Sequence, residues 1–225
     1  MDQRQKVLLR LVVELYIDTA QPVGSLALAS ESDLDVSPAT IRNELLDLEA
    51  KGFIYQPHIS AGRLPTIKGL KYYLDSLMRA EDTDDKTDLL LQSYKERWGL
   101  RGVAKLAAEV SETAAVMASD LSDYFYTGFS RLFAQPEFMD ARLVQSLSRA
   151  LDRLDDVLPA FFGQLPAGEP TIFLGRHNPF GPDCSAIFVS NGSPHGETIM
   201  GLLTPVRTNY AGHVKLLEQA VKYLD

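Results

Sequence analysis

Apolar side chains recur at helical spacing near the start of the chain. They are Leu8, Leu11, Val12, Leu15 and Tyr16. Residues three and four apart share one face of a helix, so residues 2–18 are predicted to form an amphipathic helix with Asp2 as its N-cap. A shorter helix is predicted over residues 25–31, followed by a turn over residues 32–36.

A third predicted helix has clear signals at both ends. Ser37 offers an N-cap hydroxyl, and Pro38 stands at the first helical position, where a missing N–H costs nothing. Gly52 follows the last periodic residue and marks the C-terminal stop. Residues 53–57 and 63–65 then have strand character, so a hairpin is predicted after this helix.

Thr66 can cap a fourth helix over residues 67–78. The order helix, helix, helix, hairpin, helix is that of a winged helix-turn-helix, which predicts a DNA-binding domain at residues 1–79. Acidic polar residues predict a linker over residues 80–100. The remainder, residues 101–225, is predicted to be a smaller α+β domain with an antiparallel sheet. Its predicted helices cover residues 101–120, 140–162 and 210–224, and its predicted strands cover residues 171–174, 186–189 and 198–203.

The distribution of charge affects how this pattern is interpreted. The 225 residues carry 22 Lys and Arg against 30 Asp and Glu, and the net charge of −8 argues against a nucleic-acid partner. Residues 50–74, however, contain no Asp or Glu. The positive charges in this window are Lys51, Arg63, Lys68 and Lys71, with His58 among them. Such a window is typical of a phosphate-binding surface, and it also arises by chance on an ordinary one.

The third helix offers candidate base-reading residues. Ile41, Leu45 and Leu48 fall on one face, so the residues between them are directed away from it. Arg42 can pair with guanine and Asn43 with adenine, each through two hydrogen bonds. The alternative is an ordinary solvated helix face.

Further candidates flank this face. Ser37 and Thr40 stand at the helix N-terminus, whose N–H groups favour a phosphate. Gly62 and Arg63 belong to a thin loop that can lie along a minor groove or a run of phosphates; a plain turn with one exposed Arg is the alternative. The full candidate set is Ser37, Thr40, Arg42, Asn43, His58, Ser60, Gly62, Arg63, Lys68 and Lys71.

Three segments of this region resemble the HrcA family of heat-inducible transcription repressors. They are YIDTAQPVGS at residues 16–25, LDVSPATIRN at residues 34–43 and YQPHISAGRLPT at residues 55–66. The resemblance implies that residues 37–49 form the recognition helix and residues 58–65 the wing. It also implies a palindromic operator, the inverted repeat upstream of chaperonin operons, and the chaperonin GroEL as a modulator.

Two later segments are similar to the same family. They are YTGFSRLFAQPEF at residues 126–138 and GLLTPVRTNY at residues 201–210. Family members are longer and carry a GAF-like domain with an inserted dimerising segment, which residues 120–126 pass over here. The resemblance therefore implies a short form with a reduced GAF-like domain.

An enzymatic role has one candidate cluster. Cys184 is the only cysteine, which excludes an intrachain disulfide and a multi-thiolate metal site. With Asp183, His177 and His195 it could supply a thiol nucleophile, an orienting carboxylate and a base. A small buried apolar cysteine beside a turn is the commoner situation. We therefore expect no catalytic residue, metal or cofactor.

The sequence predicts a cytoplasmic DNA-binding repressor of heat-shock genes that acts as a homodimer. The first residues have neither the apolar core of a signal peptide nor a membrane-spanning length. A two-fold dimer matches an inverted-repeat operator. Two alternatives stay open: a winged-helix regulator that responds to a small-molecule effector, and a winged-helix protein-interaction module, which only the net negative charge supports.

Overall fold

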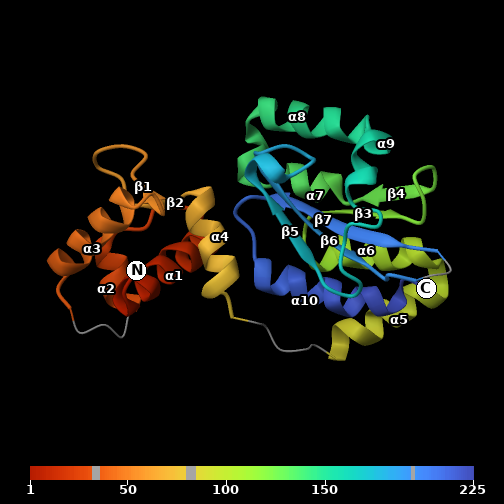
Figure 1. The fold of residues 1–225 in the computed structure, drawn as a ribbon, viewed down its shortest axis with the longest axis horizontal. Coiled ribbons are helices and arrows are strands. Elements are labelled where there is room, and N and C mark those ends of the chain that lie inside the picture. The colour runs from red at the N-terminus through yellow and green to blue at the C-terminus, as the bar shows by residue number, and fades with distance from the viewer. Residues whose placement is uncertain (32–35, 80–84, 194–195) are drawn as a thin grey trace. The chain divides into compact units, whose positions relative to one another are not determined.

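A computed structural model describes residues 1–31, 36–79, 85–193 and 196–225. The chain divides into two compact units, Met1–Arg79 and Ala80–Asp225 (Figure 1). In the described ranges, no helix is both long enough and apolar enough to cross a membrane.

The described part of the first unit consists of helices around a two-stranded hairpin. The helices are α1 (Gln3–Thr19), α2 (Ser25–Glu31), α3 (Pro38–Ala50) and α4 (Ile67–Ser76), and the strands are β1 (Ile54–Tyr55) and β2 (Leu64–Pro65). β1 and β2 pair in antiparallel orientation. The predicted order of helices and strands is confirmed for this unit.

The helix starts follow from local side-chain chemistry. Asp2, Ser37 and Thr66 each cap a helix with a side-chain oxygen that accepts a hydrogen bond from the N–H three residues later. These three predicted caps are confirmed. Most of the predicted turn at residues 32–36 lies outside the described residues.

One apolar core holds the first unit together. Its fully or almost fully buried side chains are Leu8, Leu9, Val12, Val13, Leu28, Ile41, Leu45, Leu48, Ile54 and Leu70. Burying a leucine or isoleucine side chain stabilises a fold by about 1.5–3 kcal/mol. The inward face of α3 is therefore fixed, and its opposite face is left in solvent.

The second unit, where described, is a five-stranded antiparallel sheet with helices on both faces (Figure 1). The strands are β3 (Ala114–Ala118), β4 (Tyr124–Thr127), β5 (Thr171–Leu174), β6 (Cys184–Ser190) and β7 (Ile199–Pro205), and they lie in the order β4-β3-β7-β6-β5. The helices are α5 (Asp85–Trp98), α6 (Leu100–Val110), α7 (Phe129–Phe133), α8 (Ala141–Leu151), α9 (Leu154–Val157) and α10 (Tyr210–Ala220). Short 3₁₀ turns lie at Pro136–Met139, Leu158–Ala160, Gly175–His177 and Val221–Tyr223.

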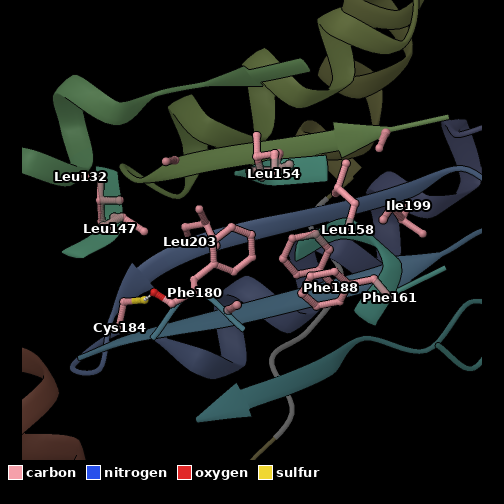
Figure 2. Close-up of a cluster of buried hydrophobic side chains, with 14 of the residues drawn as sticks. Leu132, Leu147, Leu154, Leu158, Phe161, Phe180, Cys184, Phe188, Ile199 and Leu203 are labelled. Carbon is pink, nitrogen blue, oxygen red and sulfur yellow. Dashed lines mark hydrogen bonds between the residues drawn. The ribbon is translucent and has the colours of Figure 1, made fainter. Parts of the chain in front are cut away.

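Alternate residues of each strand point into two different layers. In one layer Phe188 stacks on Phe161, with ring centroids 4.1 Å apart. Phe188 also lies over Gly201, where an added Cβ would come within 2.4 Å of the ring. Leu132 and Leu147 extend the same cluster from α7 and α8 (Figure 2). Helices α6 and α10 pack on the opposite face of the sheet (Figure 1).

Two predicted helices are wrong in extent. The helix expected over residues 101–120 ends at Val110, and residues 114–118 form β3 instead, because pairing with β4 and β7 outweighs the helix preference of alanine. The helix expected over residues 140–162 breaks after Leu151 and continues only as the short α9 and a 3₁₀ turn.

The predicted linker over residues 80–100 is also wrong for most of its length. Residues 85–98 form α5, whose Leu91 is fully buried. Tyr94 and Trp98 of this helix pack edge to face, with ring centroids 4.8 Å apart. The many charged residues of α5 made this segment resemble a linker, although its few apolar residues pack in the second unit.

Candidate nucleic-acid interface

The outward face of α3 presents the two candidate base-reading side chains. Arg42 and Asn43 are both exposed, while Ile41 and Leu45 on the opposite side are buried. Within the part of the chain that the structure describes, neither Arg42 nor Asn43 makes a side-chain hydrogen bond or ion pair. Both side chains are therefore available to an external partner.

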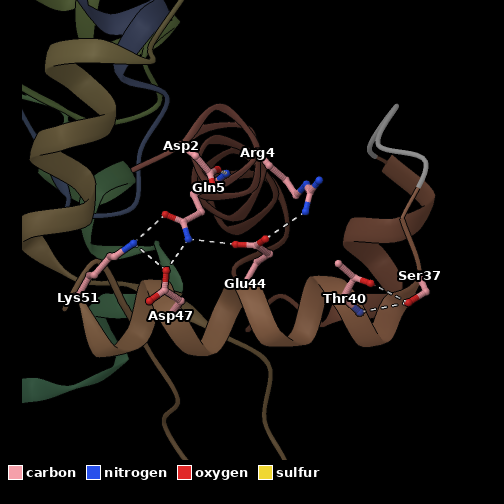
Figure 3. A network of polar contacts seen from close by, with 8 residues as sticks. All are labelled: Asp2, Arg4, Gln5, Ser37, Thr40, Glu44, Asp47 and Lys51. Carbon is pink, nitrogen blue, oxygen red and sulfur yellow. Dashed lines mark hydrogen bonds and ion pairs between the residues drawn. The ribbon is translucent and has the colours of Figure 1, made fainter.

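A polar network fixes one flank of α3 against α1 (Figure 3). The side-chain amide of Gln5 donates to Glu44 over 3.0 Å and to Asp47, and its oxygen accepts from Lys51 over 2.9 Å. Arg4 completes the network with an ion pair to Glu44 at 3.3 Å. Hydrogen bonds from Lys51 and Gln5 hold the pKa of Asp47 below its usual value. The carboxylates of Glu44 and Asp47 are thereby engaged on the α1 side.

The N-terminus of α3 uses its hydroxyl groups for capping. Ser37 Oγ accepts the Thr40 N–H at 3.2 Å and lies 3.0 Å from Thr40 Oγ1 (Figure 3). Ser37 is exposed and Thr40 is half-buried. Both therefore stabilise the helix start and remain close to any phosphate that approaches it.

The loop between β1 and β2 is braced from within. The amide of Gln56 donates to the carbonyl of Ile59 at 2.9 Å and to that of Ala61 at 2.8 Å. At the tip, His58 Nδ1 lies 3.2 Å from Ser60 Oγ. His58, Ile59 and Ser60 are all exposed, so the loop is ordered by its own hydrogen bonds while its tip faces solvent.

The loop is also bonded to the segment before α2. Val23 and Arg63 exchange two backbone hydrogen bonds of 2.8 and 2.9 Å. Gly62 packs so closely there that an added Cβ would lie 2.5 Å from the carbonyl carbon and oxygen of Val23. Glycine is therefore required at residue 62 for close backbone approach, and this is a positioning role.

Arg63 differs from its predicted placement. The sequence suggested an exposed cation on the loop, but the side chain is only 10% exposed, and its Nη2 lies 3.0 Å from Glu49 Oε2. The backbone bridge to Val23 turns this residue inward toward α3. Arg63 is thus placed to hold the loop against the helix instead of reaching a phosphate.

The two lysines of α4 differ in their surroundings. Lys68 Nζ donates to the carbonyl of Lys51 at 2.7 Å and lies 4.4 Å from the centre of the Phe53 ring. Its charge therefore sits at the C-terminal end of α3, where a cation is favourable. Lys71 is exposed on α4 and remains a candidate for phosphate contact.

Sequence reasoning missed the residues that position this surface. Gln5, Glu49 and Gln56 each connect separate elements, and Glu49 accepts the Gln56 N–H at 3.1 Å as well as the Arg63 guanidinium. The contacts of Gln5 and Glu49 join residues 7 to 46 positions apart in the chain. The spacing of hydrophobic residues along the chain does not indicate such polar pairs.

The candidate cysteine chemistry is disfavoured. Burial raises the pKa of Cys184 to about 12, so the thiol is protonated at neutral pH. Asn178 donates to its sulfur at 3.3 Å, whereas His177 and Asp183 are exposed. His195 lies outside the described residues. Among the residues described, no group of three His, Cys, Asp or Glu side chains is arranged to hold a metal ion.

Comparison with known proteins identifies the family. The family model described as "HrcA protein C terminal domain" matches residues 64–214. Proteins named heat-inducible transcription repressor HrcA are similar to the chain: that of Desulfitobacterium hafniense is 48% identical over 98 residues, covering 43% of this chain and 28% of the relative. The protein of Pelotomaculum thermopropionicum is 39% identical over 144 residues, which cover 64% of this chain and 39% of the relative. The chain spans less than two fifths of the length of these curated relatives.

A solved structure also shares the fold. The crystal structure of a hypothetical protein aligns with a TM-score of 0.81 at 18% identity, covering all of this chain (100%) and 97% of the other. This likeness agrees with the mixed α+β class and its GAF-like antiparallel sheet. Because the family model covers residues 64–214, more than half of the 225 residues, the chain belongs to the HrcA family.

Proposed function

We propose that this chain is a sequence-specific DNA-binding repressor of heat-shock genes. The observation that carries the proposal is the outward face of α3, where Arg42 and Asn43 are exposed beside a braced loop and an acid-free window. The names of the relatives, heat-inducible transcription repressors, support the same function. In this proposal residues 1–79 form a winged helix-turn-helix, with α3 as recognition helix and the loop as wing.

Each surface residue has a role in the proposed complex. Arg42 and Asn43 contact base edges in the major groove, and the α3 N-terminus with Ser37 and Thr40 contacts a phosphate. The loop tip, with His58 and Ser60, lies along the neighbouring backbone or minor groove. Lys71 and the partly engaged Lys68 add sequence-independent attraction, because cations that neutralise phosphates release bound counterions.

The proposed active species is a homodimer. One small reader module buries only about 600–1,000 Å² of protein surface on DNA, which gives limited selectivity in a genome. Two recognition helices spaced about one DNA turn apart, roughly 34 Å, would read both halves of an inverted repeat. Sedimentation of the full chain, free and on a palindrome, distinguishes a dimer from a strict monomer.

An electrophoretic shift with the inverted-repeat fragment found upstream of chaperonin operons tests the proposed function. Retention of that fragment in excess random DNA is the expected result. Equal affinity for both DNAs would contradict sequence-specific binding. Resemblance to the family also suggests GroEL as a modulator, in which case adding GroEL raises operator occupancy; an unchanged titration would exclude that partner.

A further inference from the structure

A concave surface of the first unit lies between α2, α3 and the loop that joins β1 to β2. It encloses about 490 Å³, and its lining includes Leu26 from α2, Arg42 and Leu46 from α3, and Ile59 and Ser60 from the loop. We refer to it as the α3 groove. No Asp or Glu lines it, whereas Arg42 and Arg63 do, and of these two the exposed Arg42 is the one without an ion-pair partner among the described residues.

The α3 groove has an unusual apolar rim. Leu26 is 74% exposed, Leu46 is 50% exposed and Ile59 is 98% exposed, so three large apolar side chains face solvent around one concavity. Clustered exposed apolar groups mark a binding surface more often than isolated ones do. An acid-free lining with an arginine at the edge favours an anionic occupant that also offers apolar groups.

The thymine edge of a DNA major groove has this chemistry. Among the four bases only thymine carries a C5-methyl group there, and apolar side chains contact it. The phosphates on either side supply the negative charge that the exposed Arg42 attracts. An acidic peptide would match the charge of the α3 groove. It would not explain why Arg42 and Asn43, two side chains suited to base edges, are exposed on the same helix.

The position of Leu46 on α3 makes the assignment specific. Residues four apart lie on the same side of a helix, so Leu46 stands one turn beyond Arg42. At 1.5 Å per residue the two are separated by about 6 Å along the axis. Successive bases of a strand are about 3.4 Å apart, so this separation corresponds to roughly two base steps.

We propose that Leu46 is a specificity-determining residue that packs against the C5-methyl group of one thymine in each operator half-site, about two base pairs from the base read by Arg42. Leu26 and Ile59 enclose the same strand from the sides of the α3 groove. This assignment rests on the proposed DNA-binding function and adds to it a defined base and chemical group.

Deoxyuridine substitution tests the proposal, because deoxyuridine differs from thymidine only in lacking the C5-methyl group. The probe is a palindromic fragment that the 225-residue chain selects from a random DNA pool, with each thymine of one half-site replaced in turn. For the unsubstituted chain we expect about a fourfold loss of affinity at one position, the effect of removing one buried methyl group. That position lies within about three base pairs of the one where Arg42→Ala relaxes base preference.

The decisive measurement is whether the affinity losses caused by Leu46→Ala and by removal of the thymine methyl group depend on each other. Leu46→Ala binds the thymine fragment more weakly and shows no further loss with deoxyuridine at that position. The matched control is Leu89→Ala on α5, which removes another exposed leucine and keeps the full deoxyuridine effect. Thermal melts of both variants confirm that the fold is intact.

Three outcomes would overturn the assignment. The first is a deoxyuridine effect that persists unchanged in Leu46→Ala. The second is an unsubstituted chain whose affinity falls at no deoxyuridine position. The third is normal DNA affinity of Leu46→Ala, which would show that the α3 groove does not contact DNA through Leu46. If the chain selects no palindrome at all, the proposed function fails, and the thymine contact fails with it.

Discussion

Nη2 of Arg63 lies 3.0 Å from Oε2 of Glu49, so the arginine at the base of the loop is paired with the recognition-helix candidate α3. The other oxygen of the same carboxylate accepts the N–H of Gln56 at 3.1 Å. One glutamate therefore holds both ends of the loop. This contact joins the loop to α3.

Arg63→Ala is expected to weaken binding to operator and random DNA alike without changing the salt dependence. The reason is that Arg63 positions the loop and does not neutralise a phosphate. Lys71→Ala, by contrast, is expected to lower the slope of log K against log salt by about 0.9, the value for one phosphate contact. Fluorescence anisotropy at several salt concentrations measures both.

Glu49→Gln serves as the control for Arg63→Ala. It breaks the same ion pair from the other side and removes no cation, so it should reproduce the loss of affinity with the same unchanged slope. If Arg63→Ala instead lowers the slope as much as Lys71→Ala does, Arg63 reaches a phosphate in the complex and the positioning role is wrong.

Arg42→Ala and Asn43→Ala are expected to reduce operator affinity far more than random-DNA affinity. Each side chain is exposed on the outward face of α3, and a base-edge contact contributes about 1–3 kcal/mol of discrimination. Competition assays with single-base operator variants should show relaxed preference at one position for each substitution. Equal losses on both DNAs would reassign these residues to phosphate contact.

Gly62→Ala is expected to destabilise the first unit and displace the loop. The added Cβ would lie 2.5 Å from backbone atoms of Val23, and backbone cannot move aside as a flexible side chain does. Gly24→Ala is the matched control, since a Cβ there meets nothing within 4 Å. Urea unfolding should show a lower midpoint for Gly62→Ala only; equal midpoints would mean that the backbone adjusts freely.

Gln5→Leu is expected to lower the free energy of unfolding by about 1–3 kcal/mol, the cost of leaving polar groups without partners. Gln5 is 5% exposed and contacts Glu44, Asp47 and Lys51, so its loss loosens α3 from α1 (Figure 3). Gln92→Leu removes an exposed contact to Glu96 and should change stability little. Similar effects of the two substitutions in urea would contradict a special role for Gln5.

The helices of the first unit could be predicted because their signals are local. Asp2, Ser37 and Thr66 cap the helices that they precede, and the apolar periods between them are regular. The inward turn of Arg63 could not be predicted, since it depends on a backbone bridge to Val23, forty residues earlier in the chain. Exposure at the candidate site is thus a tertiary property that residue type alone does not determine.

In the second unit, too, tertiary contacts outweighed local signals, and here they decided between helix and strand. Residues 114–118, AAVMA, have high helix propensity and an alanine-rich helix before them, yet they form the strand between β4 and β7. The chain turns at Glu112, which has a positive φ of 53°. Strand pairing with residues some eighty positions later outweighs local preference, and no local pattern records it.

The second unit is expected to lose stability as the pH falls from 7 to 5, because of one buried histidine. Burial lowers the pKa of His213 from 6.5 to about 4, and Thr208 Oγ1 lies 3.1 Å from its Nδ1. In the unfolded chain the ring regains its ordinary pKa and binds a proton between these two values, whereas the folded ring does not. Stability is therefore fully present above pH 6.5 and is lost as the pH falls toward 4, by about 2 kcal/mol between pH 7 and pH 5.

Urea unfolding followed at pH 7 and pH 5 measures this difference. His213→Gln removes the titrating ring, so the difference between the two pH values should largely disappear, even if the variant is less stable at both. His177→Gln is the matched control, since that ring is exposed and its loss should leave the difference intact. Carboxylates with lowered pKa values, such as Asp140 with a pKa of about 2, titrate below this window and do not account for the change. An equal loss of stability in the wild-type chain and in His213→Gln would show that another group controls the pH response.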